Sequence, residues 1–182
     1  MKGKPQQVIE AEIREALRLQ ERFGEALFHA DEIRGLLENY REAIARTSDL
    51  MLRNGVVEGC TVCAAQPKGS CCFSGIEDGF DEVLLLINLL LGKELPDAPE
   101  LPESCYFVGK YGCKLAAKSY FCLHYLCPGL QEALGPVGCR ELLRVVGEEL
   151  SAGWEVEQAV RRWLGKHGER GGDKTSADTG LL

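Results

Sequence analysis

The sequence predicts a mainly α-helical protein in which helices flank and pack around a loop-rich, cysteine-rich centre. Three observations support this fold class: apolar residues recur at helical spacing over residues 8–53, an apolar run covers residues 83–91, and the cysteines concentrate between residues 60 and 127. With 182 residues the chain can bury a sizeable core as one domain. We expect about four or five helices and little regular sheet.

Residues 1–55 are predicted to form two amphipathic helices, because apolar side chains alternate there with glutamate, arginine and glutamine at helical spacing. The two helices are expected to meet near His29 to Asp31, where the Asp31 side chain can act as an N-cap. The second helix should stop at Asn54-Gly55, because glycine readily adopts the left-handed conformation that ends helices.

The chain changes character over residues 56–128, which we predict to be a cysteine-rich domain. Small and polar residues without periodicity predict an irregular loop over residues 56–79. A helix is expected from Asp81 to Leu91, ending at Gly92. The prolines of "KELPDAPELPES" then mark a linker.

Residues 129–165 are predicted to form C-terminal helices that pack on the cysteine-rich domain. Their apolar spacing places two helices at about Gly138–Leu150 and Trp154–Leu164. The last residues, 166–182, are small, polar and charged, which predicts a disordered tail.

Charge and hydropathy disfavour two classes of partner. Lysine and arginine number 21 against 28 aspartates and glutamates, a formal charge of −7, so the chain lacks the basic surface that nucleic-acid binding needs. The longest apolar run is far short of the roughly 20 residues that cross a bilayer, and the N-terminus lacks the apolar core of a secretory signal. We therefore expect a cytoplasmic protein that binds neither nucleic acid nor membrane.

Two segments contain four cysteines each. The spacing is C-x2-C-x7-C-C in the first segment and C-x7-C-x8-C-x4-C in the second. The eight residues are Cys60, Cys63, Cys71, Cys72, Cys105, Cys113, Cys122 and Cys127. In a reducing compartment such cysteines indicate metal binding or redox chemistry rather than disulfides. Four thiolates can complete a tetrahedral zinc site or bind the corners of an iron–sulfur cluster.

The sequence leaves the grouping of these cysteines open. They allow two four-thiolate sites, a shared binuclear site, or one site with reserve ligands. Neighbouring residues of an extended chain point in opposite directions, so Cys71 and Cys72 favour different sites, unless one binds and the other packs. His124 is a further candidate ligand, since imidazole also binds zinc. Cys139, outside both segments, is expected to pack as a small apolar residue, with a reactive thiol as the alternative.

Residues between the second-segment cysteines supply a candidate environment for the site. An apolar shell is expected from the aromatic residues Tyr106, Phe107, Tyr111, Tyr120, Phe121 and Tyr125. Part of the thiolate charge can be offset by Lys110, Lys114 and Lys118. Solvated surface lysines would account for the same three residues.

The cysteine order resembles the YkgJ-like family, whose members are described as zinc- or iron-chelating domains. The resemblance rests on the C-x2-C pair, the C-C doublet, the apolar helix and "SCYFVGKYGCKLAAKSYFCLHYLC", and it covers roughly residues 57–128. Seven residues rather than three precede the doublet, the closing gap is longer, and Lys118-Ser119 stand where the family has Arg-Pro. The resemblance implies that all eight cysteines are metal ligands.

Two functions follow from these observations. The first is a metal-binding protein that holds Zn²⁺ or an iron–sulfur cluster, such as 4Fe-4S, while its helical flanks contact another protein. The alternative is an iron–sulfur redox protein, or an accessory part of a methylase-like enzyme, as in some relatives of the family. No nucleotide loop or catalytic triad motif accompanies the cysteines, which favours a non-enzymatic role. Closely spaced cysteines with almost no histidine favour the cluster over zinc.

Overall fold

The structure, a computed structural model, describes residues 6–64, 71–101 and 103–168. These residues form six α-helices and a single two-stranded sheet, so the mainly α prediction is confirmed and the expected number of helices is too low. The elements are α1 (Gln6–His29), α2 (Asp31–Arg53), α3 (Val56–Ala64), the 3-10 helix η1 (Ile76–Gly79), α4 (Glu82–Leu90), β1 (Val108–Gly109), β2 (Gly112–Cys113), α5 (Tyr120–His124) and α6 (Pro128–Gly168).

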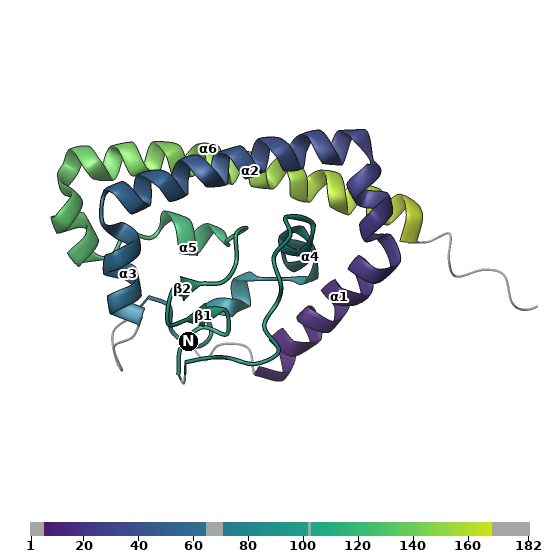
Figure 1. The fold of residues 1–182 in the computed structure, drawn as a ribbon, viewed down its shortest axis with the longest axis horizontal. Helices are drawn as coiled ribbons and strands as arrows, with labels where there is room; N and C mark the ends of the chain where they lie inside the picture. The colour runs from purple at the N-terminus through teal and green to yellow at the C-terminus, as the bar shows by residue number, and fades with distance from the viewer. Residues whose placement is uncertain (1–5, 65–70, 102, 169–182) are drawn as a thin grey trace, which may run out of the picture.

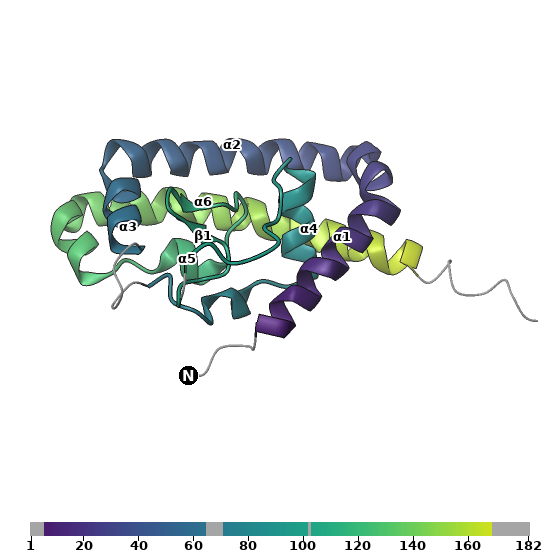
Figure 2. The same ribbon diagram turned by 60° about the horizontal axis from the view of Figure 1, so that its bottom comes forward.

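The first three helices form three sides of an open frame, and the sheet, α4 and α5 lie inside it (Figure 1). Helix α6 runs beside α2 along the long side of the frame, and both views show the two helices next to each other (Figure 2). The frame positions the cysteine-rich segments, because α1 packs on α4 and α3 packs on β2.

The ends of α2 follow local signals in the sequence. Helices α1 and α2 meet at Ala30, which has an extended conformation (φ −72°, ψ 114°), so the predicted break is confirmed. The predicted N-cap is wrong, because Asp31 is the first helical residue and its carboxylate instead pairs with Arg34 at 2.7 Å. Helix α2 ends at Arg53, and Gly55 takes the left-handed conformation (φ 70°) as predicted.

The first cysteine pair lies on a helix, so the irregular loop predicted over residues 56–79 is wrong for its first part. Helix α3 begins at Val56, whose buried side chain packs beside Leu50 and Leu126. This apolar anchoring stabilises a short helix that local propensity alone does not indicate. Residues 65–70 of the predicted loop lie outside the described residues, and the chain from Cys71 to η1 is irregular apart from a bridge at Phe73.

Helix α4 agrees with the prediction and is fastened to α6 by its N-cap. The Asp81 carboxylate accepts hydrogen bonds from the backbone N–H groups of Val83 (3.2 Å) and Leu84 (2.9 Å) and also contacts the Arg161 guanidinium. Burial tends to raise the pKa of Asp81, but these donors together hold it below its usual value. The helix ends before Gly92 as expected, and Gly92 has a left-handed φ of 81°.

One polar side chain is fully buried within α4. Asn88 Oδ1 accepts from the backbone N–H groups of Ala116 (2.8 Å) and Ala117 (3.0 Å). Its Nδ2 donates to the carbonyl oxygens of Leu84 (3.0 Å) and Ala117 (2.9 Å). Asn88 therefore fixes the backbone immediately before Lys118 against the core of the protein.

Helix α6 is continuous where the sequence predicts a gap between two helices. It extends from Pro128 to Gly168 with a kink at the non-helical Gly135 (φ 63°, ψ 176°), and beyond the kink it is unbroken, so the predicted interruption near residue 153 is wrong. Gly153 allows close approach instead, since a Cβ atom there would lie 2.9 Å from Cζ of Tyr40. The helix also includes residues 166–168 of the predicted tail, and residues 169–182 lie outside the described residues.

We expect two glycines of α6 to respond oppositely to substitution by alanine. Gly147→Ala should stabilise the protein by up to about 1 kcal/mol, because a Cβ at residue 147 meets nothing within 4 Å and alanine favours helix. Gly153→Ala should destabilise it by about 1–3 kcal/mol, because its Cβ collides with the Tyr40 ring. Urea unfolding measures both changes. Equal stabilisation by the two variants would contradict the close packing of α2 on α6.

Two buried clusters beside the main core contain cysteines. The hairpin cluster consists of Ile9, Ile13, Ala16, Phe80, Leu85, Cys105, Tyr106, Phe107, Val108 and Leu115, with Cys72 and Cys122 packed against it. The α3 cluster consists of Leu50, Val56, Leu123, Leu126, Leu142, Val145 and Val146, with Cys60 and Cys139 packed against it. Cysteines of the two sequence segments therefore pack in or against two buried clusters, the hairpin cluster and the α3 cluster.

Candidate functional site

Six of the eight predicted ligand cysteines line one cavity of about 220 Å³. They come from α3, the doublet, the segment before β1, the end of β2, and α5. The six residues are Cys60, Cys71, Cys72, Cys105, Cys113 and Cys122. Segments that are far apart in the sequence thus bring their thiols to a common space.

Cys63 and Cys127 do not line this cavity but lie close to Cys60. The C-x2-C spacing places Cys63 one turn after Cys60 on α3, so both side chains lie on neighbouring parts of one helical face. The pKa of Cys60 is raised to about 11, mainly by burial and then by the thiols of Cys71, Cys127 and Cys63 in that order. Lys118 acts in the opposite direction.

Backbone pairing holds the doublet against the second cysteine segment. The N–H group of Cys105 donates to the carbonyl oxygen of Cys72 at 2.9 Å, next to a bridge between Phe73 and Ser104. Three residues after Cys105 the chain enters the hairpin, where Val108 of β1 pairs with Cys113 of β2. The hairpin therefore returns Cys113 toward the segment that contains Cys105.

The buried thiols differ in their electrostatic environment. Burial raises the pKa of Cys105 to about 12, and it also raises the pKa of Cys122. The Ser119 hydroxyl donates to Cys122 Sγ at 3.3 Å, which stabilises a thiolate and opposes this effect. Within the doublet, a hydrogen bond from Cys72 lowers the pKa of Cys71 to about 6 and raises that of Cys72, so Cys71 ionises before Cys72.

The residues expected around the site divide into those that line the cavity and those that do not. Lys118 lines it, whereas Lys114 pairs with Glu100 at 2.9 Å and Lys110 lies over the Tyr111 ring. Three of the six aromatic residues line the cavity: Tyr111, Phe121 and Tyr125. Tyr106 and Phe107 are buried in the hairpin cluster behind Cys105.

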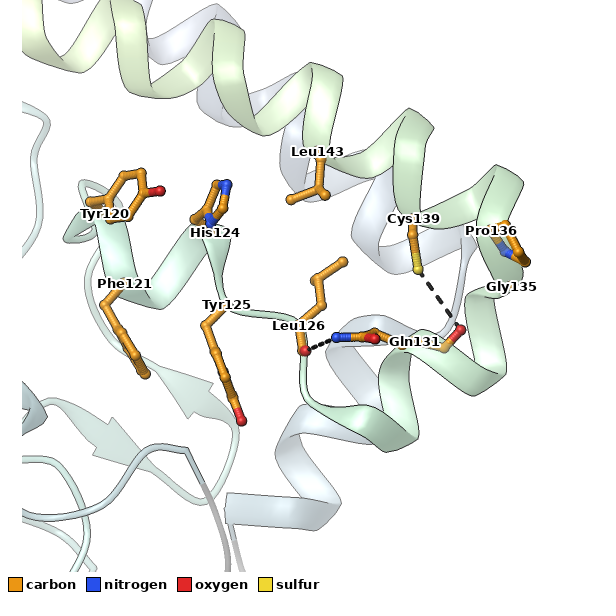
Figure 3. A pocket seen from close by; sticks show the side chains of 10 residues that line it. All are labelled: Tyr120, Phe121, His124, Tyr125, Leu126, Gln131, Gly135, Pro136, Cys139 and Leu143. Atoms are coloured by element: carbon orange, nitrogen blue, oxygen red, sulfur yellow. Dashed lines mark hydrogen bonds between the residues drawn. The ribbon is translucent and has the colours of Figure 1, made fainter.

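His124 and Cys139 lie at a second cavity of about 590 Å³, between α5 and the bent start of α6 (Figure 3). The His124 ring stacks on Tyr120 with centroids 4.8 Å apart, and Cys139 Sγ lies 3.8 Å from the carbonyl oxygen of Gln131. The stacked rings of Phe121 and Tyr125 line both cavities, as does Leu126, so the two cavities share these side chains. Neither His124 nor Cys139 lines the cysteine cavity.

The cavity brings several cysteines together, but the described residues do not have the closed geometry of a single-ion site. Its described lining consists of cysteine sulfurs, apolar and aromatic side chains, Lys118, Thr61 and the backbone of Gly112. Soft sulfur donors of this kind suit zinc and iron–sulfur clusters. Among the described residues, no three histidine, cysteine, aspartate or glutamate side chains converge on a point that could hold one ion. Ligands of a cluster bind separate corners and need not converge on one atom.

Sequence reasoning missed two residues that shape the site. Ser119 occupies the N-cap position of α5, but its hydroxyl bonds to Cys122 rather than to the helix backbone. The signal was a serine three residues before a cysteine, a spacing that places both on one face of a helical turn. Asn88 holds the backbone of Ala116, which precedes Ser119 in the chain. Its only signal in the sequence was an asparagine inside an apolar run.

Lys118 also acts on a buried carboxyl group on α6. The side chain of Glu149 is nearly inaccessible to solvent, and burial raises its pKa above the usual value. A hydrogen bond with the Thr47 side chain and the charge of Lys118 oppose this shift without cancelling it. The folded protein therefore binds a proton at Glu149 more tightly than the unfolded chain does.

We expect Glu149→Gln to stabilise the protein increasingly as the pH rises from 4 to 7. Below its usual pKa of about 4.3, Glu149 is protonated in both states, and above it folding opposes ionisation of the buried carboxyl. Glutamine does not ionise, so the substitution removes this pH-dependent loss of folding stability. Urea midpoints at several pH values measure the difference, with the exposed Glu155→Gln on the same helix as the control for loss of a charge. A pH-independent difference between Glu149→Gln and the parent would contradict this assignment.

Together, the fold and the cavity define a mainly helical, cysteine-rich protein with a shared thiol cavity. No protein-family model matches the chain, and the searches of curated proteins and of solved structures gave no significant match. None of the helices in the described part combines the length and apolar character needed to span a bilayer.

Proposed function

We propose that the protein binds a metal centre, an iron–sulfur cluster or zinc, through the thiolates of its eight segment cysteines. The observation that carries this proposal is the shared cavity, which is lined by six cysteines from five places in the chain. If these cysteines were buried only as small apolar residues, their segments would have no need to meet at one cavity.

The surroundings of the thiols support the same proposal. Apolar side chains of the hairpin and α3 clusters limit water access, while Lys118 offsets negative charge. None of the nine cysteines is in a disulfide, so each can ionise to the thiolate that binds metals in a reducing environment. The resemblance to the YkgJ-like family points to the same chemistry.

The cluster is the preferred form of the proposal. Cysteines on separate sides of a cavity can ligate the corners of a cluster, whereas zinc requires four donors to close on one ion. A cluster supplies one-electron transfer when bound, and zinc supplies structural stability. Helices α1, α2 and α6 then offer a surface to a partner protein.

Purification without oxygen tests the proposal directly. We expect brown protein with iron and acid-labile sulfide, whose broad visible absorption bleaches with dithionite. Colourless protein with stoichiometric zinc would support the zinc form. Reduced, freshly purified protein that contains neither metal and takes up neither during reconstitution would refute metal binding.

Replacing Cys63 with alanine is expected to lower the metal content per chain. The variant removes one thiolate beside Cys60 and leaves an incomplete ligand set. Cys139→Ala is the matched control, because Cys139 lies at the other cavity and should retain the full metal content. Metal analysis of both proteins, purified in parallel, measures the effect. Equal metal content would remove Cys63 from the ligand set.

A further inference from the structure

We infer that Cys72 and Cys105 form a reversible disulfide between the two cysteine segments, and that its formation prevents binding of the metal centre. The disulfide itself stands on backbone geometry, whereas its effect on the metal rests on the proposed function. Disulfides of reducing compartments are usually transient and serve catalysis or redox sensing. The reduced pair is then the form that binds metal.

The two cysteines occupy opposite positions of an antiparallel pairing. Phe73 and Ser104 form an antiparallel bridge, so the next residues along the two segments, Cys72 and Cys105, lie opposite each other. The N–H group of Cys105 donates to the carbonyl oxygen of Cys72 at 2.9 Å, which agrees with this register. The backbone therefore holds the two cysteines as a cross-strand pair.

This cross-strand position has the dimensions of a disulfide. Opposite residues at a hydrogen-bonded antiparallel position have Cα atoms about 5.5 Å apart. Disulfides most often join Cα atoms about 5.5–6 Å apart. Opposite residues also project their side chains to the same face, and both Cys72 and Cys105 contact the hairpin cluster and line the shared cavity. The two sulfurs can therefore bond with little movement of the backbone.

Cys71 is the alternative partner, because the Cys71 and Cys72 thiols hydrogen-bond to each other. Consecutive Cα atoms across a trans peptide bond are only about 3.8 Å apart. Disulfides usually span roughly 4.4–6.8 Å between Cα atoms, and departures from this range store strain. A disulfide within the doublet would strain its backbone, so Cys105 is the favoured partner of Cys72.

Exchange with a small-molecule disulfide, such as oxidised glutathione, supplies the oxidant. The sulfur of Cys72, which is partly exposed, attacks one glutathione sulfur and releases the other glutathione as a thiol. The sulfur of the buried Cys105 then attacks the Cys72 sulfur in the mixed disulfide and releases the second glutathione. The protein loses two electrons and two protons, which convert one oxidised glutathione into two reduced molecules. Two thiols of the cavity are then no longer available as ligands.

Metal-free, full-length protein equilibrated without oxygen in mixtures of reduced and oxidised glutathione tests the disulfide. The remaining thiols are blocked with N-ethylmaleimide, and mass spectrometry of the intact and digested protein identifies the linked residues. We expect a form with two fewer labels than the reduced protein, in which the peptides that contain Cys72 and Cys105 are joined. Absence of this link even in oxidised glutathione alone would overturn the inference.

Serine variants of the doublet distinguish its two thiols. Cys71→Ser should keep the link to the peptide that contains Cys105, and Cys72→Ser should lose it. Loss of the link in Cys71→Ser, or its survival in Cys72→Ser, would overturn the assignment. These two variants carry the comparison because both residues are only partly buried, whereas serine in place of the buried Cys105 would also disturb packing. Far-UV circular dichroism verifies that both variants remain helical.

Metal reconstitution separates this inference from the proposed function. Protein that holds the disulfide should lose most of its metal uptake, and reduction with dithiothreitol should restore it. Full uptake by the oxidised protein would overturn the regulatory effect of the disulfide. Reduced protein that takes up no metal would refute the proposed function, while the glutathione experiment would still measure the disulfide.

Discussion

Removing the proposed metal centre is expected to unfold the cysteine-bearing segments while the long helices remain folded. Structural metal sites contribute on the order of 10 kcal/mol to folding, which is comparable with the whole stability of a domain. In metal-free protein we therefore expect lost hydrogen-exchange protection in α3 and in residues 103–127. Helices α2 and α6 should keep theirs, because they pack directly on each other.

The position of α4 sharpens this prediction. It lies between the cysteine segments in the sequence, but its side chains Val83, Leu86, Ile87 and Leu90 belong to the main core with α2 and α6. Protection of α4 should therefore follow the long helices rather than the metal. Hydrogen exchange with mass spectrometry, with and without chelator, measures all segments in one experiment. Full protection of residues 103–127 in metal-free protein would contradict a structural role for the metal.

Replacing Asn88 with leucine is expected to destabilise the protein by at least about 3 kcal/mol. Leucine has a similar size, but it removes the partners of the Ala116 and Ala117 N–H groups and of the Ala117 carbonyl. Each buried backbone group left without a partner costs about 1–3 kcal/mol. Urea unfolding measures the loss.

The chain offers a matched control for this substitution. Asn39 is an exposed asparagine within α2, and Asn39→Leu should change stability by no more than about 0.5 kcal/mol. Faster hydrogen exchange at Ala116 and Ala117 in Asn88→Leu would show that the loss arises at these groups. If the two leucine variants had equal stability, the buried hydrogen bonds of Asn88 would not support the segment before Lys118.

Sequence patterns located the candidate site but not its arrangement. All eight cysteines were identified from their spacing, and the structure brings six of them to one cavity, with Cys63 and Cys127 outside its lining. His124 was a reasonable candidate by sequence, yet α5 turns it toward the second cavity. Ser119 was missed because a serine that hydrogen-bonds to a cysteine sulfur cannot be distinguished in the sequence from a serine that caps a helix.

The sequence by itself determined the features that depend on neighbouring residues. The amphipathic repeat of α1 and α2, the left-handed Gly55 and the end of α4 before Gly92 depend on a few neighbouring residues. Each is a local backbone preference, so each could be recognised without knowing the fold.

Only the tertiary structure decided the features that depend on contacts between distant segments. In the sequence Gly153 suggests a break in the helix, but in the structure it allows Tyr40 of α2 to pack closely. Asn88 is a polar residue in an apolar run, and in the structure it hydrogen-bonds to Ala117. Helix α3 likewise forms where Val56 finds its cluster. Packing and buried hydrogen bonds outweigh local preferences at these positions, because each local preference is worth about 1 kcal/mol or less and buried contacts are worth more.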